Sequence, residues 1–283
     1  MEERAGLIIR AEENVYIAEA EALAKRLGAR LSGDTISCGE LPESKEISVS
    51  CETQMKKGGV HSLPLGIVKA STPPLALSLG RDGLSLTDGT LTMRGDFTRL
   101  IPRLTHANLT HELLVKAAKD RRSGNPPTAV DATAGMGEDS LLLAASGFEV
   151  FLYEADPVIA ALLSDTLRRA AAVPELAEAV SRMHFTQGDS IRAMRQLSFA
   201  PDVVVLDPMF PERTKSSQVR KKFQLIHQLE APCGDEEELM AAARAAGPLR
   251  IVIKRPLKGP YLAGTRPSYS LKGKAVRYDC VIL

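Results

Sequence analysis

Apolar runs and helical patterns alternate through the second half of the chain. Five continuous apolar runs, which are typical of strands covered on both faces, lie at 128–133, 148–155, 183–189, 201–208 and 248–256. Segments with the apolar spacing of helices lie before or between them, at 110–120, 135–147, 156–173, 189–197 and 236–246. Thr110 is the expected N-cap of the first helix, and 268–283 is expected to form a closing hairpin. The alternation predicts an α/β fold with a doubly wound, mostly parallel, Rossmann-like sheet.

The first hundred residues follow a different pattern, which predicts a small α+β unit. A strand is expected at 6–10, an amphipathic helix at 14–29 and a half-buried strand at 46–54. Residues 74–95 hold three short apolar runs separated by Asp-Gly pairs, which predict a meander of antiparallel strands. We therefore expect two domains, a small N-terminal α+β domain at 1–104 and a Rossmann-like domain at 105–283.

The composition is that of a globular chain in water, with 44% hydrophobic and 25% charged residues. No run of 18 apolar residues is present, and the first residues lack the basic and apolar regions of a secretory signal. We therefore expect a cytoplasmic protein without a membrane span. The four cysteines lie far apart and the histidines show no ligand spacing, so we expect neither a metal site nor a disulfide framework. The sequence indicates no particular oligomeric state.

The net charge of +1 is the sum of segments with opposite charges. Residues 125–211 carry a net charge of −7, whereas 212–224 carry +4 and 250–283 carry +7. The overall balance argues against a protein that coats nucleic acid with its whole surface. The two basic segments still allow local recognition of one structured nucleic-acid site.

A glycine turn follows the first predicted strand of the larger domain. The strand ends at Asp131, and Gly135 and Gly137 permit a tight turn in which the backbone approaches a ligand closely. Glu138 and Asp139 then open the next helix, whose free N–H groups can also contact a ligand. Taken alone, such a turn is equally compatible with an ordinary connection between a strand and a helix.

Residues at the ends of later strands favour a ligand site. Glu154 ends the second strand 23 residues after Asp131, where a carboxylate can hold a pair of ribose hydroxyls. Asp189 and Ser190 end the third strand, where a carboxylate could face an adenine amino group. Ser140 occupies the place of the third glycine in a dinucleotide-binding turn, which favours an adenosyl ligand without a pyrophosphate. The acidic balance of this half agrees with a cationic sulfonium.

A candidate catalytic loop follows the fourth strand and reads D-P-M-F-P at 207–211. One proline lies between Asp207 and Phe210, and a second follows Phe210. Hydrogen bonds from an exocyclic amine to the Asp207 carboxylate would direct the nitrogen lone pair towards an incoming methyl group. Phe210 could stack on the plane of the base. Such a transfer needs little beyond positioning, and a strong general base is not required. The alternative is a proline-rich loop that only ends a strand.

Basic residues after this loop, or at the end of another predicted strand, are candidates for RNA phosphate contacts: Arg213, Lys215, Arg220, Lys221, Lys222, Lys254 and Arg255. The alternative for the run after the loop is a solvated charge cluster. A base inside a helix would have to be extruded to reach Phe210, so a loop or a single strand is the easier substrate.

Four motifs together resemble the RsmJ family of class I methyltransferases dependent on S-adenosylmethionine (SAM): D-A-T-A-G-M-G-E-D at 131–139, the acid at Glu154, D-P-M-F-P at 207–211 and V-I-K-R-P at 252–256. The resemblance covers about residues 105–260 and implies a Rossmann-like methyltransferase sheet with SAM as cofactor. It also implies methylation of N2 of a guanosine in 16S rRNA, position 1516 in the usual numbering, within rRNA or the small ribosomal subunit. The implied cofactor contacts are Glu138, Asp139, Glu154, Ala155, Asp189, Ser190 and Asp207.

Two other classes of function remain compatible with these residues. The same loop chemistry would serve a methyltransferase acting on another RNA base amine, a protein glutamine or a small-molecule amine. A cofactor-binding or RNA-binding subunit with a degenerate site is the non-enzymatic alternative, against which the intact Asp207 and Phe210 argue. Salt separates RNA from small substrates, because RNA binding weakens steeply as salt is added.

Overall fold

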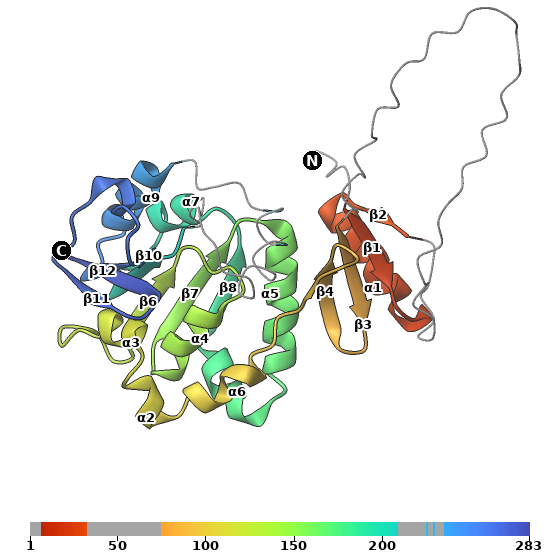
Figure 1. The fold of residues 1–283 in the computed structure, drawn as a ribbon, viewed down its shortest axis with the longest axis horizontal. Helices are drawn as coiled ribbons and strands as arrows, with labels where there is room; N and C mark the ends of the chain where they lie inside the picture. The colour runs from red at the N-terminus through yellow and green to blue at the C-terminus, as the bar shows by residue number, and fades with distance from the viewer. Residues whose placement is uncertain (1–6, 33–74, 209–224, 226–228, 230–234) are drawn as a thin grey trace, which may run out of the picture.

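A computed structural model describes residues 7–32, 75–208, 225, 229 and 235–283 (Figure 1). Within this part of the chain lie a five-stranded sheet near the N-terminus and a seven-stranded sheet built from the later strands. The predicted strand at 46–54 lies outside the described residues. Across the described ranges, no helix is both long enough and apolar enough to cross a membrane.

The seven-stranded sheet is mostly parallel, as the continuous apolar runs predict. Its strand order is β11-β12-β10-β9-β6-β7-β8. The parallel strands are β6 (Thr128–Asp131), β7 (Glu149–Glu154), β8 (Met183–Gln187), β9 (Val203–Leu206) and β10 (Arg250–Pro256). The expected hairpin closes the sheet through β11 (Tyr269–Lys272) and β12 (Val276–Ile282), and β12 runs antiparallel to β10. The order reverses between β6 and β9, and ligands bind beyond the carboxyl ends of strands at such a point.

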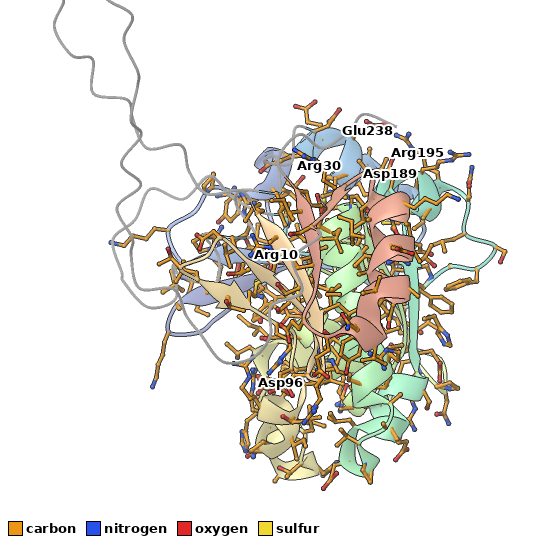
Figure 2. The ribbon with its side chains drawn as sticks, turned by 90° about the vertical axis from the view of Figure 1, so that its right-hand side faces the viewer. Arg10, Arg30, Asp96, Asp189, Arg195 and Glu238 are labelled. Carbon is orange, nitrogen blue, oxygen red and sulfur yellow. The ribbon has the colours of Figure 1, made fainter. Side chains whose placement is uncertain are left out.

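Helices cover both faces of this sheet. Successive residues of a strand point to opposite sides, so a strand that is apolar throughout places apolar side chains on both faces. Val203 packs in one core cluster, whereas its neighbour Val204 packs in another. The first face is covered by α3 (Leu113–Ala118), α4 (Glu138–Ala145), α5 (Pro157–Ala170) and α6 (Pro174–Ser181). The second face carries α7 (Ser190–Arg195) and α9 (Glu236–Ala245). An ion pair of 2.8 Å between Arg195 and Glu238 joins these two helices (Figure 2).

The helices at 110–120 and 156–173 differ from the sequence prediction. Thr110 is not the N-cap of the first of these: α3 begins at Leu113 with Glu112 as its N-cap, and Thr110 lies at the C-terminal end of the short α2 (His106–Leu109), which Thr105 caps. The pattern at 156–173 is divided, because α5 ends at Ala170 and Pro174 opens α6. Proline suits the first helical turn, where its missing N–H has no partner to lose. Short 3-10 helices complete the described secondary structure at η1 (Asn14–Tyr16), η2 (Thr98–Arg103) and η3 (Leu262–Gly264).

The N-terminal unit contains the expected meander and helix. The antiparallel strands are β3 (Ala76–Gly80), β4 (Gly83–Thr87) and β5 (Thr92–Met93). The helix α1 (Ile17–Leu27) ends at Gly28, whose φ of 62° is left-handed. The strand β1 (Ile8–Ala11) pairs in parallel with both β3 and β2 (Arg30–Leu31). This parallel pairing was not evident from the sequence pattern, since it joins segments far apart in the chain.

The N-terminal unit packs against α5, one of the helices that cover the seven-stranded sheet (Figure 1). Leu77 and Leu86 of the small sheet share a core cluster with Val158 and Leu162 of α5. Apolar side chains on α5 therefore face both sheets, since Leu163 belongs to the cluster beneath the larger sheet. The two units are joined by burial of apolar surface, which is the main favourable contribution to such contacts.

Polar groups complete this contact around Asp165 of α5. The buried Asp165 carboxylate accepts the backbone N–H of Leu84 at 2.9 Å and the Arg169 Nε–H at 2.8 Å. Arg169 also donates to the backbone oxygen of Gly95 at 2.7 Å. These bonds position the segment after β5 relative to the larger sheet.

Removal of the Asp165 carboxylate is expected to lower the free energy of unfolding by about 1–3 kcal/mol. The reason is that Asp165→Ala leaves the Leu84 N–H without its buried acceptor and removes the carboxylate that pairs with Arg169, which then keeps only the Gly95 oxygen of these two contacts. Urea unfolding followed by circular dichroism measures the change. Glu178→Ala is the control, because Glu178 pairs with Arg182 while 82% exposed, and its loss should cost less than about 0.5 kcal/mol. Equal effects of the two substitutions would contradict the proposed importance of Asp165.

Candidate active site

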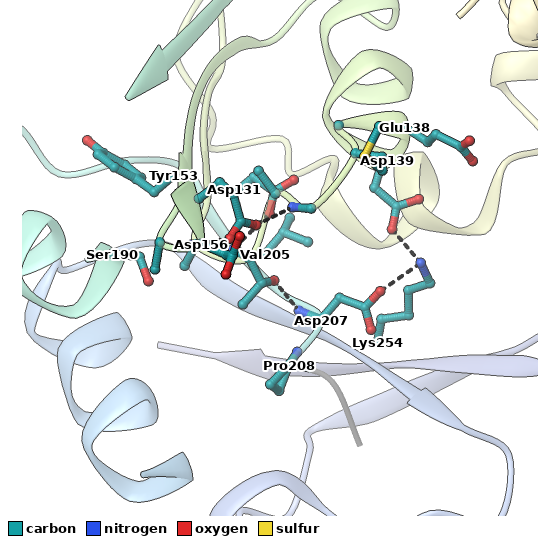
Figure 3. A pocket seen from close by; sticks show the side chains of 18 of the residues that line it. Asp131, Glu138, Asp139, Tyr153, Asp156, Ser190, Val205, Asp207, Pro208 and Lys254 are labelled. Carbon is teal, nitrogen blue, oxygen red and sulfur yellow. Dashed lines mark hydrogen bonds and ion pairs between the residues drawn. The ribbon is translucent and has the colours of Figure 1, made fainter. Parts of the chain in front are cut away.

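A pocket of about 760 Å³ opens beyond the carboxyl ends of β6, β7 and β9 (Figure 3). The ten residues that the sequence singled out for cofactor binding all line it: Asp131, Gly135, Gly137, Glu138, Asp139, Glu154, Ala155, Asp189, Ser190 and Asp207. They meet because the carboxyl ends of parallel strands lie at one edge of the sheet. The structure thus brings together residues that are spread over 77 positions of the chain, from Asp131 to Asp207.

The glycine turn between β6 and α4 forms one wall of the pocket. Gly135 and Gly137 have φ angles of 52° and 76°, which lie in the left-handed region that favours glycine. The carboxylate of Glu154 accepts the backbone N–H of Gly135 at 2.9 Å and that of Asp156 at 2.7 Å. Burial raises the pKa of Glu154, although these N–H groups oppose the effect. Each oxygen retains a second lone pair that can accept a ligand hydroxyl.

Asp131 is buried at the end of β6, with 2% of its surface exposed. The Ser140 hydroxyl donates to its Oδ2 at 2.5 Å, and the Thr133 N–H donates to its Oδ1 at 3.1 Å. Burial raises the pKa of Asp131 to about 7, and the nearby carboxylates of Asp139 and Asp207 add to the effect. Ser140, which stands in place of a third glycine, therefore has a role that the sequence pattern did not reveal: it supports Asp131.

Lys254 of β10 links two acidic residues at the pocket (Figure 3). Its Nζ lies 2.7 Å from Asp139 Oδ2 and 2.9 Å from Asp207 Oδ2. The Asp207 side chain is 42% exposed, but the walls of the pocket surround it, and this enclosure raises the pKa of Asp207. The positive charge of Lys254 opposes that rise. The sequence placed Lys254 at a phosphate contact, whereas the structure directs its ammonium to two carboxylates.

The remaining wall combines the predicted Asp189 and Ser190 with residues that sequence reasoning missed. Asp189 accepts the N–H of Ile191 at 2.9 Å and so caps α7, beside the buried Ser190. Tyr153 lines the pocket, as does the segment 93–95 from the N-terminal unit. No local signal marks residues 93–95 as part of this site, because Met93 ends the edge strand β5 of a different sheet and residues 94–95 follow that strand.

The other predicted contacts divide into two groups. Phe210 and the basic run after it lie outside the described residues: Arg213, Lys215, Arg220, Lys221 and Lys222. Arg255 is placed differently from the prediction, because its side chain is 1% exposed. Its Nε donates to the Pro260 oxygen at 3.0 Å, and its Nη1 lies 3.6 Å from Glu236. This burial contradicts the expectation that Arg255 contacts RNA phosphates.

The lining residues suit a cationic adenosyl ligand. Seven acidic residues line the pocket: Asp131, Glu138, Asp139, Glu154, Asp156, Asp189 and Asp207. Among the described lining residues only Arg94 and Lys254 are basic, and Lys254 already contacts two carboxylates. This charge balance fits the sulfonium and hydroxyl groups of SAM better than it fits a polyphosphate. In the described ranges, no group of three or more histidine, cysteine or acidic side chains is arranged to hold a metal ion.

Comparisons with known proteins agree with this chemistry. Residues 65–282 match the model of a family described as SAM-dependent methyltransferases. A protein from Thioalkalivibrio sulfidiphilus named "Ribosomal RNA small subunit methyltransferase J" is 40% identical over 229 residues, which are 78% of this chain and 89% of the relative. A protein of the same name from Pseudomonas aeruginosa (strain UCBPP-PA14) is 40% identical over 240 residues, 82% of this chain and 91% of the relative. The crystal structure of a SAM-dependent methyltransferase from Neisseria gonorrhoeae matches with a TM-score of 0.65 at 27% identity, covering 98% of this chain and 95% of that one.

Proposed function

Because the chain belongs to the SAM-dependent methyltransferase family of ribosomal RNA small subunit methyltransferase J, we propose that it methylates the exocyclic N2 of a guanosine in 16S rRNA. We assign the guanosine at position 1516, within 16S rRNA or the small ribosomal subunit, and we place the reaction in the cytoplasm. The observation that carries the proposal is the Asp207 carboxylate, which lies in the pocket at the end of β9, where it can accept an amine N–H.

The cofactor would be held by the acidic residues at the strand ends. SAM, when bound, supplies a methyl group on a sulfonium sulfur, whose transfer to the amine nitrogen yields S-adenosylhomocysteine and releases one amine proton. Glu154 would accept the ribose hydroxyls, and Asp189 would face the adenine amino group. Ala155 and Ser190 would complete the adenosyl contacts, and the glycine turn would allow the close approach of the backbone.

Asp207 would orient the target amine rather than remove its proton before transfer. Its carboxylate accepts an N–H, which directs the nitrogen lone pair away from the ring and towards the methyl group. Phe210 is our candidate for stacking on the base. The basic run from Arg213 to Lys222 is our candidate for phosphate contacts, since it lies in the segment 212–224, which carries a net charge of +4 and follows the catalytic loop directly.

The decisive experiment offers the protein a substrate that lacks the modification. Small subunits and naked 16S rRNA from a strain without N2 methylation are incubated with SAM that carries a labelled methyl group, and the product is mapped by mass spectrometry of nuclease fragments. We expect label at N2 of one guanosine near the 3′ end. Absence of label from both substrates, with SAM bound in a parallel titration, would exclude the proposal. Label on another base amine would support methyl transfer to RNA but would contradict the assignment of guanosine N2 as its target.

The affinity for SAM is expected to rise with pH through the titration of Asp131. The pKa of this carboxyl is raised to about 7, and a cationic ligand favours the ionised form, so affinity grows as pH increases towards and past 7. We expect an increase of roughly three- to tenfold between about pH 6 and about pH 8. Calorimetric titration measures it. S-adenosylhomocysteine shares the amino acid group of SAM but lacks the sulfonium charge, so its affinity should increase less between these pH values. In Asp131→Asn, the affinities of the two ligands should change with pH to the same extent. An unchanged difference in Asp131→Asn would assign the pH effect to another group.

A further inference from the structure

Lys254 lies where the proposed transfer chemistry would take place. Its ammonium bridges a carboxylate from the first turn of α4 and another at the end of β9, and we call Asp139, Lys254 and Asp207 the bridging triad. Only a quarter of the Lys254 side chain is exposed. An ammonium has three N–H donors, and two of them point at the carboxylates of this triad. Lys254 is therefore poorly placed to contact a phosphate on the outside of the protein.

The groups around Asp207 are mostly acidic, which makes this cation important. Asp139 of α4 acts to raise the pKa of Asp207, and Asp139 and Asp207 both act to raise the pKa of Asp131 at the end of β6. Burial also raises the pKa of Tyr278 on β12, and the carboxylates of Asp139 and Asp207 add to that rise. Arg255 acts in the opposite direction, but its charge is directed to Glu236 on α9. Among the described residues, Lys254 is thus the cation in direct contact with the Asp207 carboxylate.

A protonated Asp207 could not serve the proposed reaction. A carboxylate accepts hydrogen bonds at both oxygens, whereas a carboxylic acid presents an O–H donor on one of them. Lys254 occupies Oδ2, and among the described residues no hydrogen bond is made to Oδ1, which can therefore accept an amine N–H. The backbone N–H of Asp207 is tied to Thr133 Oγ1 at 2.6 Å, so both the main chain and the side chain of this residue are held.

We propose that Lys254 is a positioning residue of the methyl transfer, which holds Asp207 as an oriented carboxylate so that its free oxygen accepts the N–H of the target amine. The inference rests on the proposed function for its consequence in catalysis. The contact between Lys254 and Asp207 exists in the protein without its substrates, so the effect on Asp207 can be measured independently of methylation. Lys254 itself stays protonated: burial acts to lower its pKa, but Asp139 and Asp207 outweigh that effect and raise it.

The test compares Lys254→Met with Lys254→Arg, and uses Lys258→Met as a matched control. Lys258 is an exposed cation four residues further along the same segment, so its loss removes one charge without touching the triad. The first readout is the pH titration of the Asp207 carboxyl carbon in the cofactor-free protein, by NMR of isotope-labelled aspartate, with Asp207→Asn used for assignment. We expect its midpoint to move upward in Lys254→Met, to return towards the wild-type value in Lys254→Arg and to stay in place in Lys258→Met.

The second readout is the pH profile of turnover with saturating rRNA. Because Asp207 acts when ionised, a raised midpoint moves the acidic fall of kcat to higher pH. The ratio of kcat at about pH 8.5 to that at about pH 6 should therefore grow at least about tenfold in Lys254→Met. If the Asp207 midpoint stays in place in Lys254→Met, the proposal is wrong. A higher KM for rRNA with a flatter salt dependence and an unchanged pH profile would instead identify a phosphate contact. If Lys254→Met does not fold, Lys254→Gln and Lys254→Arg provide the same comparison.

The two readouts separate this inference from the proposed function. An upward shift of the Asp207 titration without any methylation of rRNA would retain the electrostatic role of Lys254 and refute the rRNA substrate. Methylation of rRNA without any shift of the Asp207 titration in Lys254→Met would retain the rRNA substrate and refute the electrostatic role of Lys254.

Discussion

Asp207→Ala is expected to reduce kcat for methyl transfer at least a hundredfold, or about 2.7 kcal/mol, while the Kd for SAM changes by less than about tenfold. The loss is large because the carboxylate is the acceptor proposed to orient the amine, and groups that organise developing charge in a closed site are typically worth this much. The variant should fold, since Lys254 keeps Asp139 as a partner at 2.7 Å and is not left alone in the pocket. Single-turnover assays with equilibrium titration of SAM separate the two quantities.

Asp207→Asn refines this experiment. The amide keeps one oxygen acceptor and gains an NH₂ group, which Lys254 would repel. The amide oxygen would therefore face the Lys254 ammonium, and the NH₂ group, which cannot accept a hydrogen bond, would face the target amine. We therefore expect the asparagine variant to be nearly as slow as the alanine variant. Wild-type turnover in Asp207→Ala would refute the assigned role, and a parallel loss of SAM affinity would make Asp207 chiefly a cofactor ligand.

Gly137→Ala is expected to weaken SAM binding by at least about tenfold and to lower the thermal stability. Gly137 has a φ of 76°, where a side chain costs about 1–2 kcal/mol. A Cβ atom there would also lie 2.7 Å from Leu163 Cδ1, so the buried Leu163 side chain, the turn or α5 must shift. Such overpacking typically costs a further ~1–3 kcal/mol. Calorimetric titration and thermal unfolding measure the two effects.

Gly147→Ala is the matched control for this prediction. Its φ of 102° carries a comparable backbone cost, but a Cβ there would meet nothing within 4 Å, and the residue follows the opposite end of α4 from the pocket. It should lower stability and leave SAM affinity near the wild-type value. If Gly137→Ala bound SAM as tightly as Gly147→Ala, the close packing of the glycine turn would not be required for the cofactor.

The strand ends of the site could be predicted because one physical rule places them together. Asp131, Glu154 and Asp207 each follow a continuous apolar run, and parallel strands bring such ends to one edge of the sheet. The parallel sheet itself follows from the same runs. Helix starts were harder: Thr110 has the chemistry of a cap but lies at the end of α2, and α3 begins after Glu112, whose side chain makes no cap hydrogen bond.

The basic residues were harder still, because charge along a sequence does not show where a side chain points. Lys254 and Arg255 are neighbours on one strand, so they face opposite sides of the sheet. Lys254 consequently meets the carboxylates of the pocket, and Arg255 is buried beside Glu236 on the other face. Residues 93–95 could not be assigned to the pocket at all, because their position depends on the docking of one sheet against a helix of the other.

That docking ties cofactor affinity to the cohesion of the two parts of the chain. The segment 93–95 lines the pocket, and Arg169 holds its Gly95 oxygen from α5. Any free energy that a ligand gains from this wall is reciprocally a free energy that holds the N-terminal sheet on α5. Loss of that sheet would remove part of the binding site and expose Val158 and Leu162 to water. The affinity for the cofactor and the attachment of the small unit to α5 are therefore coupled. Substitutions that strengthen or weaken this attachment should change cofactor affinity without altering any residue that touches the transferred methyl group.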